Sequence, residues 1–192
     1  MHDILTLKEY FCGGEYLQNI LFHRKWCHHG TGFEQFISEH VYPKVPYGEL
    51  DYDSIVDSPE FIDRLTKWIP NRFHFACTML LQDLNKCKVT ESTWEINRVI
   101  RCPSTGIETL FSKPKYYGKY WSAGIVPSPW GIGESVVNDA TIWITAIAHA
   151  KDINWLETVR SRMDFDNGDD EHEIQLFEGT ILPDFTYAVI AR

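Results

Sequence analysis

The chain has 192 residues, of which 44% are hydrophobic and 23% are charged, a composition typical of a folded globular protein rather than a disordered one. Its formal net charge of −9 disfavours a general nucleic-acid binder, which needs a basic face to neutralise phosphates. No apolar run approaches the roughly 18–20 residues of a membrane-spanning helix. Five cysteines without a CxxC motif or a signal-like N-terminus favour reduced thiols and a cytoplasmic protein.

The first part of the chain has the apolar periodicity of helices. Apolar residues recur at helical spacing on both sides of Gly13-Gly14, and this glycine pair is expected to break or kink the segment. A second, short helix is expected from Phe33 to Val41. The loop that follows contains Pro43, Pro46 and Gly48. These patterns predict a helical N-terminal third.

Two further helices are expected before the chain changes character. Asp57 or Ser58 is a candidate N-cap, with Pro59 in the first turn. We expect this helix to end near Trp68, because Ile69-Pro70 follows. Another helix is predicted from about Asn71 to Asn85, where the apolar residues again share one face.

The remainder of the chain has the alternation and turn residues of strands. The predicted strands are Thr93–Ile100, Ile107–Phe111, Thr141–Ala148, Glu173–Phe177 and Phe185–Ile190. A long loop is expected over Lys113–Gly133, and a short helix or turn begins at Ile153. The order predicts a single α+β domain over 1–192, mainly helical over 1–90 and mainly strands and loops over 91–192, with a mostly antiparallel β core.

The acidic pair in Glu171-His172-Glu173 is the first candidate site. In an extended strand, residues i and i+2 point to the same side, so both carboxylates would face one way. Ile174 and Leu176 would lie on the opposite, apolar face. The structural alternative is the hydrated end of a strand.

The segment Cys27-His28-His29-Gly30-Thr31-Gly32 is the second candidate site. Its glycines permit close backbone approach to a ligand, and His29 offers a donor and an acceptor beside that backbone. A turn with an incidental histidine is the structural alternative. A zinc site at His23 and Cys27 is disfavoured, because no second cluster supplies further ligands, so no metal is predicted.

Tyrosines and a tryptophan lie among lysines in the third candidate, the segment from Lys113 to Ser122. Aromatic rings among lysines can stack on a planar ring and hold phosphates. The same rings can cover a hydrophobic surface, so both interpretations remain open.

Together these three pieces resemble the ADP-ribosyltransferase superfamily. Glu171-His172-Glu173, an apolar run and Gly179-Thr180 resemble the Glu-x-Glu strand and the turn that follows it in the arginine-modifying branch. His29-Gly30-Thr31 resembles the His-Gly-Thr element of the poly-ADP-ribose polymerase and diphtheria-toxin-type branch. Ser112–Tyr117 resembles that branch's segment ending in a ring-stacking tyrosine.

The resemblance implies an NAD-dependent mono-ADP-ribosyltransferase on a split-sheet fold. It implies that Glu173 is the catalytic glutamate and that Glu171 helps to activate the acceptor. It further implies that NAD is held by His29, Gly30, Thr31 and Tyr117, with the tyrosine on nicotinamide. The arginine-modifying branch also uses a first-strand arginine and a Ser-Thr-Ser. Arg24 is the candidate arginine, and the serines before the Thr141 strand are Ser122, Ser128 and Ser135.

An interaction protein is the alternative from a different class. Acidic immunity or anti-defence proteins inhibit basic partners through electrostatic complementarity, which the net charge of −9 and the acidic run Asp164–Glu173 would serve. If the chain is a transferase, its acceptor is a protein or another macromolecule. The net charge disfavours nucleic acid without removing it as an acceptor.

Overall fold

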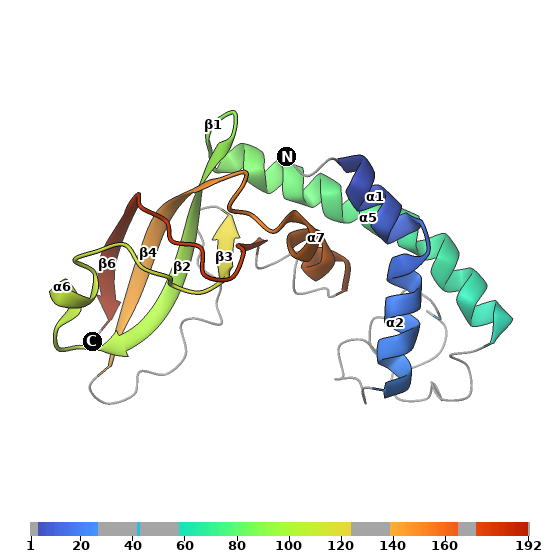
Figure 1. Ribbon diagram of the computed structural model, residues 1–192, viewed down its shortest axis with the longest axis horizontal. Helices are drawn as coiled ribbons and strands as arrows, with labels where there is room; N and C mark the ends of the chain where they lie inside the picture. Colours follow the sequence, from blue (N-terminus) through green and yellow to red (C-terminus); the bar gives the residue numbers. More distant parts are fainter. Residues whose placement is uncertain (1–3, 27–41, 43–57, 124–138, 165–171, 192) are drawn as a thin grey trace. The chain divides into compact units, whose positions relative to one another are not determined.

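The computed structural model describes residues 4–26, 42, 58–123, 139–164 and 172–191 (Figure 1). Helices precede an open antiparallel sheet of six strands, which confirms the predicted α+β class. The chain divides into two compact units, each described below by itself. A helical unit contains residues 1–78 and 159–166, and a sheet unit contains residues 79–158 and 167–192. None of the helices in the described residues is long and apolar enough to cross a membrane.

The helical unit begins with α1 (Ile4–Cys12) and α2 (Glu15–Trp26), separated at Gly13-Gly14 as predicted. The Gly13 N–H still donates to the Glu9 carbonyl at 2.7 Å, so the last turn of α1 is closed. Gly14 then takes a φ of +102°, in the left-handed region that glycine adopts without steric cost. This one residue turns the chain into α2.

The helix α5 (Pro59–Lys86) crosses the point where the sequence predicted two helices. Ser58 caps it as expected, since the Ser58 hydroxyl accepts the Phe61 N–H at 3.2 Å. The predicted stop before Pro70 is wrong. Pro70 removes only one helical hydrogen bond, whereas the apolar face continues unbroken on both sides of it. The buried residues of that face are Phe61, Leu65, Ile69, Phe73, Ala76, Leu80 and Leu84.

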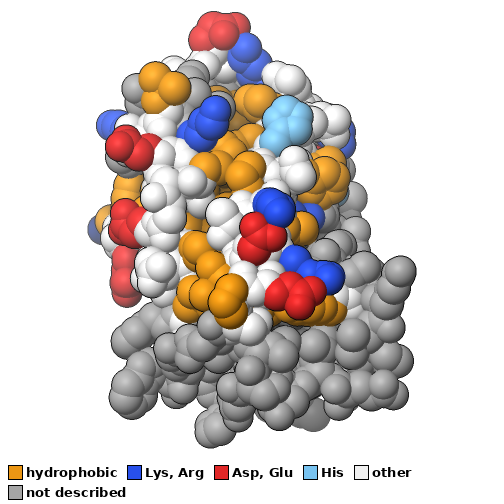
Figure 2. Space-filling view, turned by 90° about the vertical axis from the view of Figure 1, so that its right-hand side faces the viewer, with side chains coloured by type: hydrophobic (Ala, Val, Ile, Leu, Met, Phe, Trp, Pro, Cys, Tyr) orange, Lys and Arg blue, Asp and Glu red, His pale blue; other side chains and the backbone are white. Residues whose placement is uncertain are grey.

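Aromatic contacts between α1 and α5 hold the helical unit together. Phe11 is fully buried and stacks on Phe73 with ring centroids 5.6 Å apart. Arg160, from α7 (Trp155–Asp164), donates to the Tyr10 hydroxyl at 2.7 Å. The face of the molecule in Figure 2 carries hydrophobic side chains interspersed with acidic and basic ones. Burial of these aromatic rings contributes to the stability of this unit.

The sheet has the strand order β5-β3-β2-β4-β6, with β1 paired to β2, and every pairing is antiparallel. The six strands are β1 (Lys88–Thr90), β2 (Thr93–Pro103), β3 (Tyr120–Ala123), β4 (Asp139–His149), β5 (Glu173–Gln175) and β6 (Phe185–Ala191). The long strands β2 and β4 pair along their whole length, from Thr93–His149 to Pro103–Asp139. They form the rigid centre of the sheet, with β6 beside β4 in Figure 1.

The two faces of the sheet differ in chemistry, because alternate residues of a strand point to opposite sides. One face, called here the apolar face, is the core of the unit. Its fully buried residues are Ile96, Ile142, Ile144, Ala148 and Ile174. The other face, called here the polar face, carries hydroxyl, amide and carboxylate groups. Figure 1 shows α6 (Ile107–Leu110) lying beside the sheet at its β6 side.

Two sequence predictions fail in the segment between β2 and β4. Residues Ile107–Phe111 do not form a strand, since a left-handed Gly106 (φ +79°) precedes the short helix α6. Ile107 and Phe111, four residues apart, are both buried, as one face of a helical turn requires. The expected loop also contains β3, whose partners are distant in sequence and therefore leave no local signal.

Candidate functional site

A row of polar residues runs across the polar face of the sheet at one register position. Glu173 on β5 pairs with Ser122 on β3, which pairs with Asn97 on β2. Asn97 pairs with Thr145 on β4, and Thr145 pairs with Thr186 on β6. Directly opposed side chains in an antiparallel sheet lie about 4.5–5.5 Å apart at Cβ. We call these five residues the polar row, and they form a continuous line of hydrogen-bonding groups.

The middle of the polar row is buried and hydrogen-bonded. Asn97 and Ser122 are each only 2% exposed. The Asn97 Oδ1 atom accepts from the Thr145 hydroxyl at 2.7 Å and from the Trp143 indole N–H at 2.9 Å. Buried polar groups are costly unless they are paired, so these bonds fix the amide orientation. The Asn97 amide NH₂ then points away from these two donors.

The Glu173 carboxylate lies half-buried at the β5 end of the polar row. Gln175, two residues later on the same face, donates its side-chain N–H to Glu173 Oε1 at 2.7 Å. This bond orients the carboxylate. The structure therefore places the Glu173 carboxylate and the Ser122 side chain at one register position, with the Asn97 amide on the next strand.

The start of α7 holds β5 in place. The Asn154 side chain caps α7, because its Oδ1 atom accepts the Glu157 N–H. The backbone N–H of Asn154 donates to the Gln175 carbonyl at 2.8 Å. The buried Thr158 hydroxyl accepts the Gln175 N–H at 3.0 Å. A strand of only three residues gains its position from these bonds rather than from its own length.

His172, immediately before Glu173, is anchored from α5. Its Nδ1 atom lies 2.9 Å from Asp83 Oδ1, an ion-pair distance without the geometry of a hydrogen bond. Asp83 is 1% exposed, and Lys86 Nζ lies 3.6 Å from the same oxygen. His172 has a φ of +50°, which is uncommon for a residue other than glycine, and its carbonyl accepts the Ala123 N–H. The turn into β5 is thus held by the side-chain contact of His172 and by the backbone hydrogen bond to its carbonyl.

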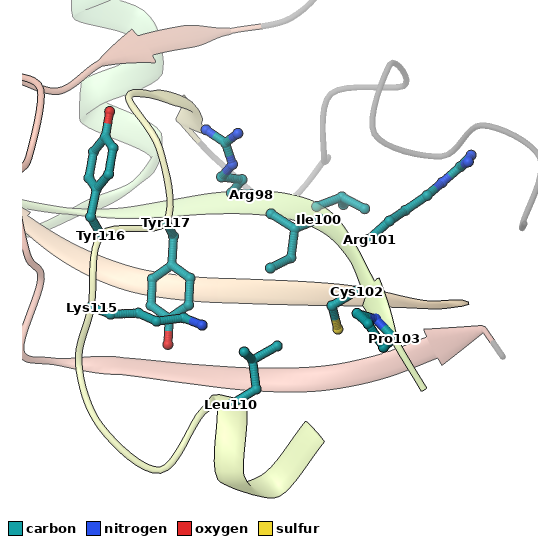
Figure 3. A pocket seen from close by; sticks show the side chains of 10 residues that line it. Arg98, Ile100, Arg101, Cys102, Pro103, Leu110, Lys115, Tyr116 and Tyr117 are labelled. Atoms are coloured by element: carbon teal, nitrogen blue, oxygen red, sulfur yellow. The ribbon is translucent and has the colours of Figure 1, made fainter. Parts of the chain in front are cut away.

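Tyr117 lies on the other side of the sheet (Figure 3). It is 7% exposed and its ring is parallel to that of Phe111, with centroids 5.5 Å apart. It also packs on Phe185, which is paired with Ala146 on the apolar face. The structure therefore does not bring Tyr117 and Glu173 to the same face. The tyrosine is part of a buried aromatic cluster.

The other predicted ligand-binding and catalytic residues lie outside the described residues. These residues are His29, Gly30, Thr31 and Glu171, and the predicted helix Phe33–Val41 lies there too. Arg24 lies in the helix α2 and so is not on a strand. The described ranges contain no group of three or more His, Cys, Asp or Glu side chains that could hold a metal ion.

Sequence reasoning missed the partners of Glu173. Ser122 was one serine among three in an expected loop, and Asn97 was one alternating residue of a predicted strand. The neighbouring residues in the chain mark neither Ser122 nor Asn97 as a partner of Glu173. The three residues are aligned by the register of β3 between β2 and β5. The short alternation in Tyr120–Ala123 was the only local signal for that strand.

Comparison with known proteins gives no match for this chain among protein-family models, curated proteins or solved structures.

Proposed function

We propose that this protein is an NAD-dependent mono-ADP-ribosyltransferase-like enzyme that cleaves the nicotinamide–ribose bond and transfers ADP-ribose to a macromolecular acceptor. The observation that carries the proposal is the pairing of Glu173 with Ser122 at one register position. The resemblance of Glu171-His172-Glu173 to a Glu-x-Glu strand implies a serine-bearing strand as well. A serine on the strand next to Glu173 is the arrangement that such a site needs.

This reaction needs few protein groups, and what matters most is where they are held. Breaking the bond between nicotinamide and ribose creates an oxocarbenium-like centre, and a fixed carboxylate stabilises the developing positive charge. Glu173 is oriented for this by Gln175 and by the bonds that α7 makes to β5. The buried Ser122 side chain beside it can hold the carboxylate in position for the sugar.

The neighbouring strand β2 also carries an arginine, Arg98, which lies on the opposite face of the sheet from Glu173 and Ser122. It follows Asn97 on β2, and its Nη1 donates to the Tyr120 carbonyl on β3 at 2.5 Å. Of the residue types that the arginine-modifying branch uses, serine and glutamate thus share the polar face on the neighbouring strands β3 and β5, and Arg98 does not share that face. We propose a split-sheet fold built on β3 and β5, without Arg98 in the NAD site.

The test is release of nicotinamide from NAD by the wild-type protein and by Glu173→Gln. The substitution keeps the size of the side chain and removes the charge, so turnover should fall by at least about a hundredfold, the scale of lost transition-state charge stabilisation. Glu95→Gln is the matched control. Glu95 lies exposed on the same face of the sheet, and its substitution should leave turnover unchanged.

Release by the wild type and by Glu95→Gln, but not by Glu173→Gln, would support the proposal. Ser122→Ala should then lower turnover while the protein remains folded, as judged by circular dichroism. If the wild type neither releases nicotinamide nor shows a thermal shift with NAD, both alone and in a cell lysate that supplies acceptors and activating partners, the proposal is wrong.

A further inference from the structure

Two exposed aromatic side chains lie next to the polar row, at the β5 end of the sheet. Tyr120 on β3 is paired with Gln175 on β5, two residues along the strands from the pair of Ser122 and Glu173. Phe177 follows Gln175 by two residues in an extended chain, so its side chain lies on the same face as Tyr120. Diagonal neighbours of this kind lie about 7–8 Å apart. Tyr120 is 49% exposed and Phe177 is 41% exposed, and we call them the aromatic pair.

A cation already lies over the tyrosine of this pair. The Lys119 ammonium is 4.9 Å from the centroid of the Tyr120 ring, within the range of a cation–π interaction. Tyr120 is the main cause of a raised pKa of Lys119, and the carboxylates of Glu157 and Glu178 raise it further. The ring and the two carboxylates thus favour a positive charge at this place.

Backbone contacts of β5 bring the two carboxylates to the aromatic pair. Leu176, which precedes Glu178 by two residues, donates its N–H to the Lys119 carbonyl at 2.8 Å. Glu157 lies in the first turn of α7, which is held against β5 by the bonds described above. Glu173 adds a third carboxylate, on the face of the sheet that carries the aromatic pair. The surroundings of the pair are therefore acidic overall, with Lys119 as a cation among three carboxylates.

We propose that the aromatic pair is a docking site for a basic protein segment, in which an arginine side chain lies on Tyr120 and Phe177 in the place of Lys119. A guanidinium suits this place better than an ammonium, because it is planar, stacks on aromatic faces and is more weakly hydrated. The same guanidinium can bind the exposed carboxylate of Glu178. The net charge of −9 would attract a basic partner, and tyrosine and arginine often carry the binding energy of interfaces. This docking site goes beyond the proposed reaction, and its test contains no NAD.

The test measures binding of an end-blocked peptide in which glycine and arginine alternate, by calorimetry at low ionic strength. The wild type should bind it at millimolar concentration or below, and should not bind the corresponding glycine–glutamate peptide. Tyr120→Leu combined with Glu178→Gln should weaken binding roughly fivefold to tenfold, the scale of one cation–π contact and one exposed ion pair. Tyr187→Leu combined with Glu108→Gln is the matched control. It makes the same chemical changes at exposed residues of β6 and α6 and should leave binding unchanged.

Lys119→Gln gives a second readout of opposite sign. It removes the cation that now lies over the Tyr120 ring, so the arginine peptide should bind about twofold more tightly or better. Lys113→Gln makes the same change in net charge at an exposed residue before β3 and should strengthen binding less. Circular dichroism would establish that each variant is folded. The docking site is refuted if the wild type does not bind the arginine peptide, if the two double variants bind alike, or if Lys119→Gln binds no more tightly than Lys113→Gln.

Discussion

Thr158→Val tests whether α7 fixes the strand that carries Glu173. Valine has nearly the shape of threonine, so the packing of this fully buried side chain is retained. The hydroxyl that accepts the Gln175 N–H at 3.0 Å is lost. Gln175 is 8% exposed, so its N–H gains no water in exchange. Leaving a buried donor unsatisfied costs about 1–3 kcal/mol.

The assay is thermal unfolding followed by circular dichroism. For a chain of this size, each kcal/mol lowers the melting temperature by roughly 2–4 °C, so we expect a fall of several degrees. Thr158→Ser is the control, because it retains the hydroxyl and loses only a methyl group, worth about 0.8 kcal/mol. If valine were tolerated as well as serine, the hydroxyl would not hold β5, and the account of how Glu173 is positioned would fail.

Two further predictions concern a glycine and a cysteine. A Cβ atom at Gly118 would lie 2.6 Å from Arg98 Nη1, whereas one at Gly179 would meet nothing within 4 Å, and both glycines have positive φ. Gly118→Ala should therefore unfold in less urea than Gly179→Ala, and equal midpoints would show that Arg98 moves aside at no cost. Burial, and secondarily Cys12, raises the pKa of Cys77 to about 11 from an ordinary value of 9.0. The folded protein thus favours the protonated thiol of Cys77. The stability that this protonated thiol contributes is lost as the pH rises from 9 through 11. Alkylation by iodoacetamide, followed by mass spectrometry, should have its midpoint for Cys77 near pH 11, and a midpoint near pH 9 would contradict this.

Local signals in the sequence predicted the long elements. The Gly13-Gly14 break, the Ser58 cap and the strands that became β2 and β4 each depend on residues close together in the chain. The exception is Pro70. The rule that a proline ends a helix predicted a break there, and α5 continues through it. The apolar face of α5 buries enough surface on both sides to outweigh one missing hydrogen bond.

The candidate site was predicted only in part, because its geometry depends on contacts that span much of the chain. The position of Glu173 on a strand before a buried Ile174 follows from alternation alone. Its alignment with Ser122 requires β3, and the anchoring of His172 requires Asp83, which is 89 residues earlier. No spacing rule links residues so far apart, so these partners emerge only when the sheet is assembled.

The two edges of the sheet differ in a way that limits how it can grow. The outer edge of β5 is occupied by the bonds to Asn154 and Thr158 and by the Ile153–Leu176 bridge. β6, at the opposite end of the strand order, has no further strand beside it in the described part of the chain. Its sequence, FTYAVIA, has none of the charges or prolines that usually prevent edge-to-edge association. An additional strand, from a second molecule or from a growing aggregate, would therefore join the sheet at β6, and a lysine placed there would act as a barrier to it.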